Sequence, residues 1–219
     1  MKECYLCGEI LVKKKNRSKD HVPPDCIFPS EKPWNLITVP CCVNCNEKYR
    51  LLDEKMRNFF AILADKNSAE VGDIARRVVL RSSKLSREFH SHVRPHPSLV
   101  DSADNPRHLF FFDEKELNPW LVRVVKGLFY HKNGFRLSNE AVFKVGKLPE
   151  LKPPSSETFP MEEGLELRPY FAYGVLQNIE RPNTDFWVLV FYDHLVFTVD
   201  VEVPNCVHNS KDSKGGEAG

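Results

Sequence analysis

The chain has 219 residues and a mass of 25.3 kDa, enough for one large domain or two small ones that bury their own core. Lys and Arg total 31 against 30 Asp and Glu, so the net charge of +1 excludes a histone-like or strongly acidic protein. There is no apolar run of about 18 residues and no signal-peptide pattern, so we expect a cytoplasmic protein without membrane contact.

The first third of the chain predicts two short strands and then helices. Residues 17–22 and 36–39 have the composition of strands, and the four prolines within 23–34 indicate a loop between them. Apolar residues then recur at spacings of three and four over 45–64 and over 71–89, which predicts two helices.

The rest of the chain predicts one more helix and a β region. Asn118-Pro119 is typical of a helix start and Asn133-Gly134 of a helix end, so we expect a helix over 120–130. The predicted strands are rich in aromatic and β-branched residues, with a turn at Asp193-His194 between the last two. They cover residues 171–179, 186–192 and 195–203.

These patterns predict an α+β protein in two parts. We expect an N-terminal module over 1–65 and an α+β domain of unassigned role over 66–208. Within the second part, residues 149–169 are rich in Pro, Ser and Glu and indicate a linker, and the polar residues 209–219 indicate a disordered tail.

Six of the seven cysteines lie before residue 46, which favours a metal site over disulfides in a reducing compartment. Cys4 and Cys7 form one CxxC pair and Cys42 and Cys45 form another, and four thiolates suit a tetrahedral structural Zn²⁺. Cys41 is an alternative to Cys42 but gives a spacing of three intervening residues. Cys26 and Cys206 have no partner pattern, which favours small buried residues.

Polar residues of a second kind lie between and just after the cysteine pairs. Asp20-His21 precedes Val-Pro-Pro, Asn35 precedes Leu-Ile-Thr-Val-Pro, and Asn46 directly follows Cys45. In this order, and framed by two CxxC pairs, the residues resemble the HNH endonuclease family. The resemblance covers about residues 4–60 and implies a zinc-stapled ββα-metal fold for the N-terminal module.

The resemblance also implies a role for each of these residues. His21 corresponds to the general base of the family and Asn35 to the residue that orients it. Asp20 and Asn46 correspond to ligands of the catalytic metal, with Asn46 in the place of the family's last His. Because an amide oxygen is a harder ligand than imidazole, this His-Asn-Asn variant favours Mg²⁺ or Mn²⁺ at the catalytic position.

The chemistry of these residue types agrees with that implication. A neutral His accepts a proton near neutral pH, and a divalent cation on carboxylate and amide oxygens stabilises the charge that grows on a leaving alkoxide. Asp20 and His21 are neighbours on a predicted strand, so they share one site only where the strand ends or bends. Taken one at a time, Asp20-His21 is also compatible with a solvated pair, and Asn35 and Asn46 with turn and helix caps.

A run of positive charge leads into this motif. Its five side chains would lie along a phosphate backbone and feed it to the metal, although a solvated loop is an equally good interpretation. They are Lys13, Lys14, Lys15, Arg17 and Lys19.

The sequence therefore predicts an HNH-type endonuclease that hydrolyses DNA, with Zn²⁺ as structural metal and Mg²⁺ or Mn²⁺ as catalytic metal. Two alternatives stay open. One is a non-catalytic zinc-knuckle protein that binds nucleic acid, and the other is a nuclease directed at RNA. The convergence of Asp20, His21 and Asn46 on one open position would favour the enzyme.

Overall fold

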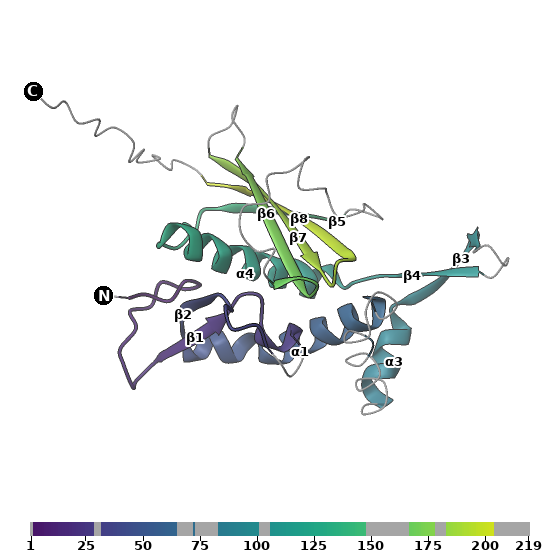
Figure 1. Cartoon of the computed structure of the whole chain (residues 1–219), viewed down its shortest axis with the longest axis horizontal. Coiled ribbons are helices and arrows are strands. Elements are labelled where there is room, and N and C mark those ends of the chain that lie inside the picture. The colour runs from purple at the N-terminus through teal and green to yellow at the C-terminus, as the bar shows by residue number, and fades with distance from the viewer. Residues whose placement is uncertain are drawn as a thin grey trace, which may run out of the picture.

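Figure 1 shows the computed structural model, in which helices pack against antiparallel sheets, as the α+β prediction requires. The structure describes residues 2–28, 32–64, 72, 83–100, 106–147, 167–177 and 183–203. Cys206, the predicted tail 209–219 and most of the predicted linker 149–169 lie outside these residues. Among the helices within them, none has the length and apolar character needed to cross a bilayer.

A two-stranded hairpin and a long helix begin the fold. β1 (Arg17–His21) pairs antiparallel with β2 (Thr38–Cys42), and α1 (Val43–Ala64) follows directly, while the short helix η1 (Asp25–Ile27) lies in the predicted loop. β2 begins two residues later than predicted and runs through Pro40. The missing N–H of Pro40 is tolerated because its backbone faces away from β1, where its carbonyl accepts from the Tyr5 N–H at 3.0 Å.

α1 confirms the helix predicted over 45–64 and begins two residues earlier. Its buried residues Met56, Phe59, Phe60 and Ala64 recur at spacings of three and four, so one stripe of the helix faces the core.

The middle of the chain was predicted less well. Of the helix expected over 71–89, the structure describes α3 (Ser83–Ser91), while 73–82 lie outside the described residues. β3 (Val93–Val100) and β4 (Pro106–Phe110) form an antiparallel hairpin that the sequence did not predict. Prolines at the start of β4 and inside β3 hid both strands, because proline usually indicates a strand end.

α4 (Glu114–Asn133) starts earlier than the predicted 120–130, so the start assigned to Asn118-Pro119 was wrong. Asp113 is the N-cap, and its carboxylate accepts from the Lys115 N–H at 2.9 Å. Pro119 lies inside the helix instead of in its first turn. The predicted end is confirmed: Gly134 adopts φ 77°, and its N–H donates to the Tyr130 carbonyl at 2.8 Å.

The C-terminal region is a four-stranded antiparallel sheet in the order β5-β8-β7-β6. The three predicted strands are confirmed within two residues at each end as β6 (Phe171–Gln177), β7 (Thr184–Phe191) and β8 (Leu195–Glu202). The turn between β7 and β8 is also confirmed, with positive φ at Tyr192 and Asp193. β5 (Val142–Lys147) was not predicted.

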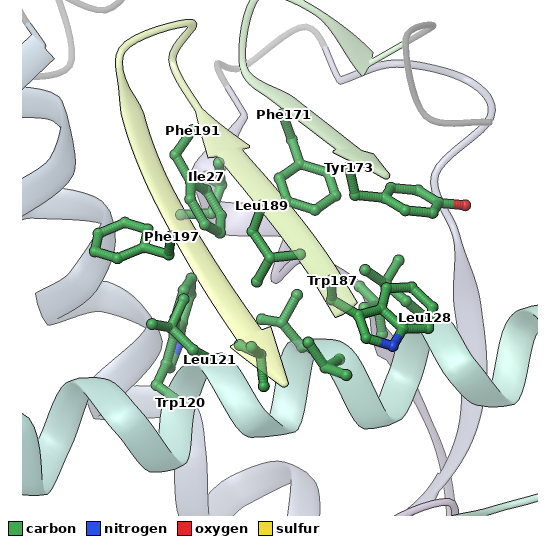
Figure 2. Packing of buried hydrophobic residues seen from close by; sticks show 14 of the residues in the cluster. Ile27, Trp120, Leu121, Leu128, Phe171, Tyr173, Trp187, Leu189, Phe191 and Phe197 are labelled. Atoms are coloured by element: carbon green, nitrogen blue, oxygen red, sulfur yellow. The ribbon is translucent and has the colours of Figure 1, made fainter. Parts of the chain in front are cut away.

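The main core lies between α4 and one face of this sheet. Figure 2 shows Trp120, Leu121 and Leu128 of α4 beneath aromatic and aliphatic side chains of β6, β7 and β8. The same core continues into α1, because the ring of Phe60 lies 5.5 Å from that of Trp120 and 5.0 Å from that of Phe191. The boundary near residue 65 stays a prediction, and buried contacts connect the two sides of it.

Candidate functional site

Four cysteine sulfurs gather beside the first hairpin. The Sγ atoms of Cys4, Cys7, Cys42 and Cys45 all lie within 4.8 Å of one another, and those of Cys7 and Cys42 are 3.8 Å apart. A tetrahedral Zn²⁺ with sulfur at about 2.3 Å places its ligands about 3.8 Å apart. The cluster therefore fits a structural metal ion such as zinc.

Local backbone geometry forms each half of the cluster. After Cys4 the chain turns back so that the Gly8 N–H donates to the Cys4 carbonyl at 2.9 Å, with Gly8 at φ 77°, a conformation that favours glycine. In the second pair, the first turn of α1 brings the Cys45 N–H to 3.4 Å from the Cys42 sulfur. Both pairs are thus placed by short-range structure and joined by the hairpin.

Cys41 lies outside this group, although its sulfur is 3.8 Å from that of Cys4. The hydrogen bond between the Cys4 and Cys41 sulfurs lowers the pKa of Cys4 to about 4, against the opposing effect of burial. Cys41 therefore contacts the cluster through Cys4 without belonging to it. The prediction of Cys42 as the fourth member agrees with the geometry.

A cavity of about 360 Å³ opens next to this cluster, between the hairpin and α1. It brings together Asp20 and His21 from the end of β1 with Asn46 from the first turn of α1, and Lys19 reaches the same wall. Its other lining residues are Pro24, Asp25, Cys26, Glu47, Arg50 and Asp53. Asn35 is half-buried in the segment before β2 and does not line this cavity.

His21 and Asp20 share the cavity although strand neighbours point to opposite faces. β1 ends at His21, and Val22 continues the pairing with an N–H that donates to the Ile37 carbonyl at 3.0 Å. Asp20 is buried and His21 is half-buried. Both residues line the cavity at the end of β1.

The carboxylate of Asp20 is held by two buried side chains. Arg123 of α4 donates from Nη2 to Oδ1 at 2.7 Å and from Nε to Oδ2 at 3.2 Å, and the Tyr5 hydroxyl donates to Oδ2 at 2.6 Å. Asp20 is 4% exposed and Arg123 is 3% exposed, so water contributes little to this pair. Oδ1 accepts from Arg123 alone among the described residues, which leaves one of its lone pairs available.

A second carboxylate joins the same guanidinium. Asp53 of α1 accepts from Arg123 Nη1 at 2.5 Å and from the Trp120 indole N–H at 2.8 Å. Burial raises the pKa of Asp53 to about 6, while the charge of Arg123 opposes that rise. When both carboxylates are ionised, two negative charges share one positive charge beside the cavity, and the site favours a cation.

Asn46 is oriented by the hairpin. Its Nδ2 donates to Ser18 Oγ at 3.1 Å, which leaves the amide Oδ1 as the atom that can act as a ligand. Ser18 lies two residues before Asp20 on β1, so both residues belong to the same face of the strand.

The basic residues of the predicted stretch divide into two groups. Lys13, Lys14 and Lys15 lie exposed in the turn before β1, and Arg17 and Lys19 are exposed at alternate positions of β1. Lys19 alone among these five lines the cavity.

Sequence reasoning missed Tyr5, Asp53 and Arg123, which belong to no local motif. One signal was present: Arg123 is a charged residue within the apolar run Trp-Leu-Val-Arg-Val-Val, and a charge there needs a buried partner. The identity of that partner depends on tertiary packing. Searches against protein-family models, curated proteins and solved structures each find no match to the chain.

Proposed function

We propose that the protein is a metal-dependent nuclease of the HNH type that hydrolyses phosphodiester bonds of DNA. The observation that carries this proposal is the convergence of Asp20, His21 and Asn46 on one cavity beside a four-cysteine cluster. The order of two strands and a helix, with the second cysteine pair at the start of the helix, supports a ββα-metal module.

His21 is the general base in this proposal. Its half-buried imidazole lines the cavity, where it can accept a proton from an attacking water. The hairpin fixes its position, because His21 is paired with Thr38 at the last step of the β1–β2 ladder. Asn35 retains only an indirect role, through the loop that leads to β2.

Oδ1 of Asp20 and Oδ1 of Asn46 are the atoms that would hold a catalytic Mg²⁺ or Mn²⁺. Such a cation supplies Lewis-acid stabilisation of the charge that grows on the leaving 3′-oxygen. Arg123 and Tyr5 orient the Asp20 carboxylate from behind, as hydrogen-bonded partners of metal ligands commonly do. Lys19 and Arg17 contact the phosphates on either side of the cleaved bond.

Plasmid nicking tests this proposal. Purified protein with supercoiled plasmid should nick it with Mg²⁺ or Mn²⁺ and not with EDTA, and His21→Ala should lose about 100-fold or more of the rate. His194→Ala is the matched control, because His194 is exposed in the β7–β8 turn. Equal nicking by His21→Ala and the unchanged protein, with zinc retained in both, would overturn the assignment of His21.

One observation favours a non-catalytic alternative. Arg123 already compensates the charge of Asp20, so Asp20 is also suited to a purely structural role in a zinc-knuckle protein that binds nucleic acid. Salt-sensitive DNA retention without cleavage in any metal would support this alternative. Parallel assays on RNA of the same sequence distinguish an RNA-directed nuclease.

A further inference from the structure

Trp34 is the most exposed large apolar side chain in the part of the chain that the structure describes. Its side chain is 95% exposed, whereas the next, Leu51, is 74% exposed. The two other tryptophans of the chain, Trp120 and Trp187, are buried in the core. A fully solvated indole gains nothing from folding, so its exposure suggests a surface that binds something.

The chain on both sides of Trp34 is tied to the cavity. Two residues earlier, the Lys32 ammonium donates to the Asp25 carboxylate at 2.5 Å, and Asp25 lines the cavity. Four residues later, Thr38 is paired with His21. Since two residues span at most about 7 Å, Trp34 belongs to the short segment that Lys32 links to the cavity wall.

We propose that Trp34 stacks on an unpaired base of the nucleic acid strand that the cavity holds. This inference rests on the proposed nuclease function and adds a substrate class to it: strands with unpaired bases over uninterrupted duplex. Inside a duplex both faces of each base are covered by neighbouring bases, so a protruding indole finds no face to contact. An unpaired base offers that face, and stacking of this kind does not depend on base identity.

The surroundings favour a nucleic acid over a protein partner. Arg17 and Lys19, exposed on β1, supply positive charge on the strand that leads to His21, which suits phosphates. Trp34 lies between the half-buried Pro33 and Asn35, and the exposed Lys32 is two residues away, so a charge lies close to the indole, whereas the centre of a protein interface is depleted of charged residues.

Tryptophan fluorescence gives a direct test with the full chain. Because Trp120 and Trp187 are buried, quenching by added ligand reports mainly on Trp34. In EDTA, a single-stranded oligonucleotide should quench the emission, and a blunt duplex of the same length should quench it much less. Equal quenching by the two would overturn the preference for unpaired bases.

Substitution provides the second readout. Trp34→Ala should weaken binding of the single strand by about 5- to 100-fold and leave duplex binding nearly unchanged, while Trp34→Phe keeps part of the effect. Leu51→Ala is the matched control, an exposed apolar residue of α1 next to Arg50. Unchanged single-strand binding by Trp34→Ala would overturn the inference. So would acrylamide quenching of Trp34 that falls as protein concentration rises without any nucleic acid, because Trp34 would then be covered by a second copy of the chain.

The two proposals fail separately. If plasmid nicking depends on His21 but Trp34→Ala cleaves gapped and intact duplexes in the same ratio as the unchanged protein, the stacking role is wrong and the nuclease stands. If nothing is cleaved while the single strand still quenches Trp34, the nuclease is wrong and the binding surface stands.

Discussion

Arg123 on α4 binds the carboxylate of Asp20 on β1 through both oxygens, across 103 positions of sequence and at nearly complete burial. The same guanidinium binds Asp53 and lies 4.6 Å from the ring centre of Tyr49. One side chain from the second half of the chain thus holds together three residues of the first half.

Removal of Arg123 should be costly. Arg123→Met leaves Asp20 and Asp53 buried without their cation, and we expect a loss of about 3 to 5 kcal/mol in the free energy of unfolding in urea. Lys115→Met, at an exposed position of the same helix, should change it by less than about 0.5 kcal/mol. A loss below about 1 kcal/mol for Arg123→Met would mean that the ion pair contributes little.

The cysteine cluster should hold one zinc ion per chain. Elemental analysis of purified Cys42→Ser should show most of that zinc lost, because three thiolates remain where four are needed. Cys41→Ala and Cys26→Ala should keep it, since neither residue belongs to the group. If Cys41→Ala loses the zinc and Cys42→Ser keeps it, then Cys41 and not Cys42 is the fourth zinc ligand.

Stability should depend on pH through Asp53. Burial raises the pKa of Asp53 to about 6, above about 3.9 in an unfolded chain. The folded state therefore binds this proton more tightly, and the residue's contribution to the free energy of unfolding falls as pH rises from about 4 to about 6. The change amounts to about 2 to 3 kcal/mol.

Asp53→Asn isolates this effect. Urea unfolding of both proteins between about pH 4 and pH 7 should show the stability of the unchanged protein declining relative to that of Asp53→Asn. A difference that is constant or grows with pH would show that attraction to Arg123 outweighs burial at this carboxylate.

Gly127 should resist substitution although it lies within a helix. A Cβ at this position would lie 2.4 Å from Val22 Cγ2, so Gly127→Ala should destabilise the protein by about 1 to 3 kcal/mol despite the better helix propensity of alanine. Val22→Ala removes the obstructing methyl groups, and the double variant should be more stable than the sum of the single effects predicts. If the losses of the two single variants simply add in the double variant, the cost of Gly127→Ala does not come from a clash with Val22.

Short-range signals predicted much of this fold. The helix over 45–64, the helix end at Gly134 and the three C-terminal strands each depend on periodicity or on one turn residue. The grouping of Cys4 and Cys7 with Cys42 and Cys45 was likewise visible in spacing, because a tetrahedral metal site constrains its ligands more than their separation in sequence does.

Other features depended on partners that sequence does not reveal. α4 begins at Glu114 because the cap Asp113 and Glu116 three residues later form a start signal, yet Asn118-Pro119 gave a competing one. Arg123 contacts Asp20 and Asp53 only when α4 packs against β1 and α1, and Tyr5 reaches Asp20 from the segment before β1. Convergence of polar residues is a tertiary property.

The close approach of α4 to β1 limits how the chain can be divided. Asp20 and Val22, on either side of His21, contact Arg123 and face Gly127 respectively. A fragment that contains only the cysteines and the Asp-His motif would lack Arg123, whose charge neutralises the buried Asp20. The smallest transferable piece therefore includes α4 and, because the apolar face of α4 is buried against the sheet, the four strands of that sheet as well.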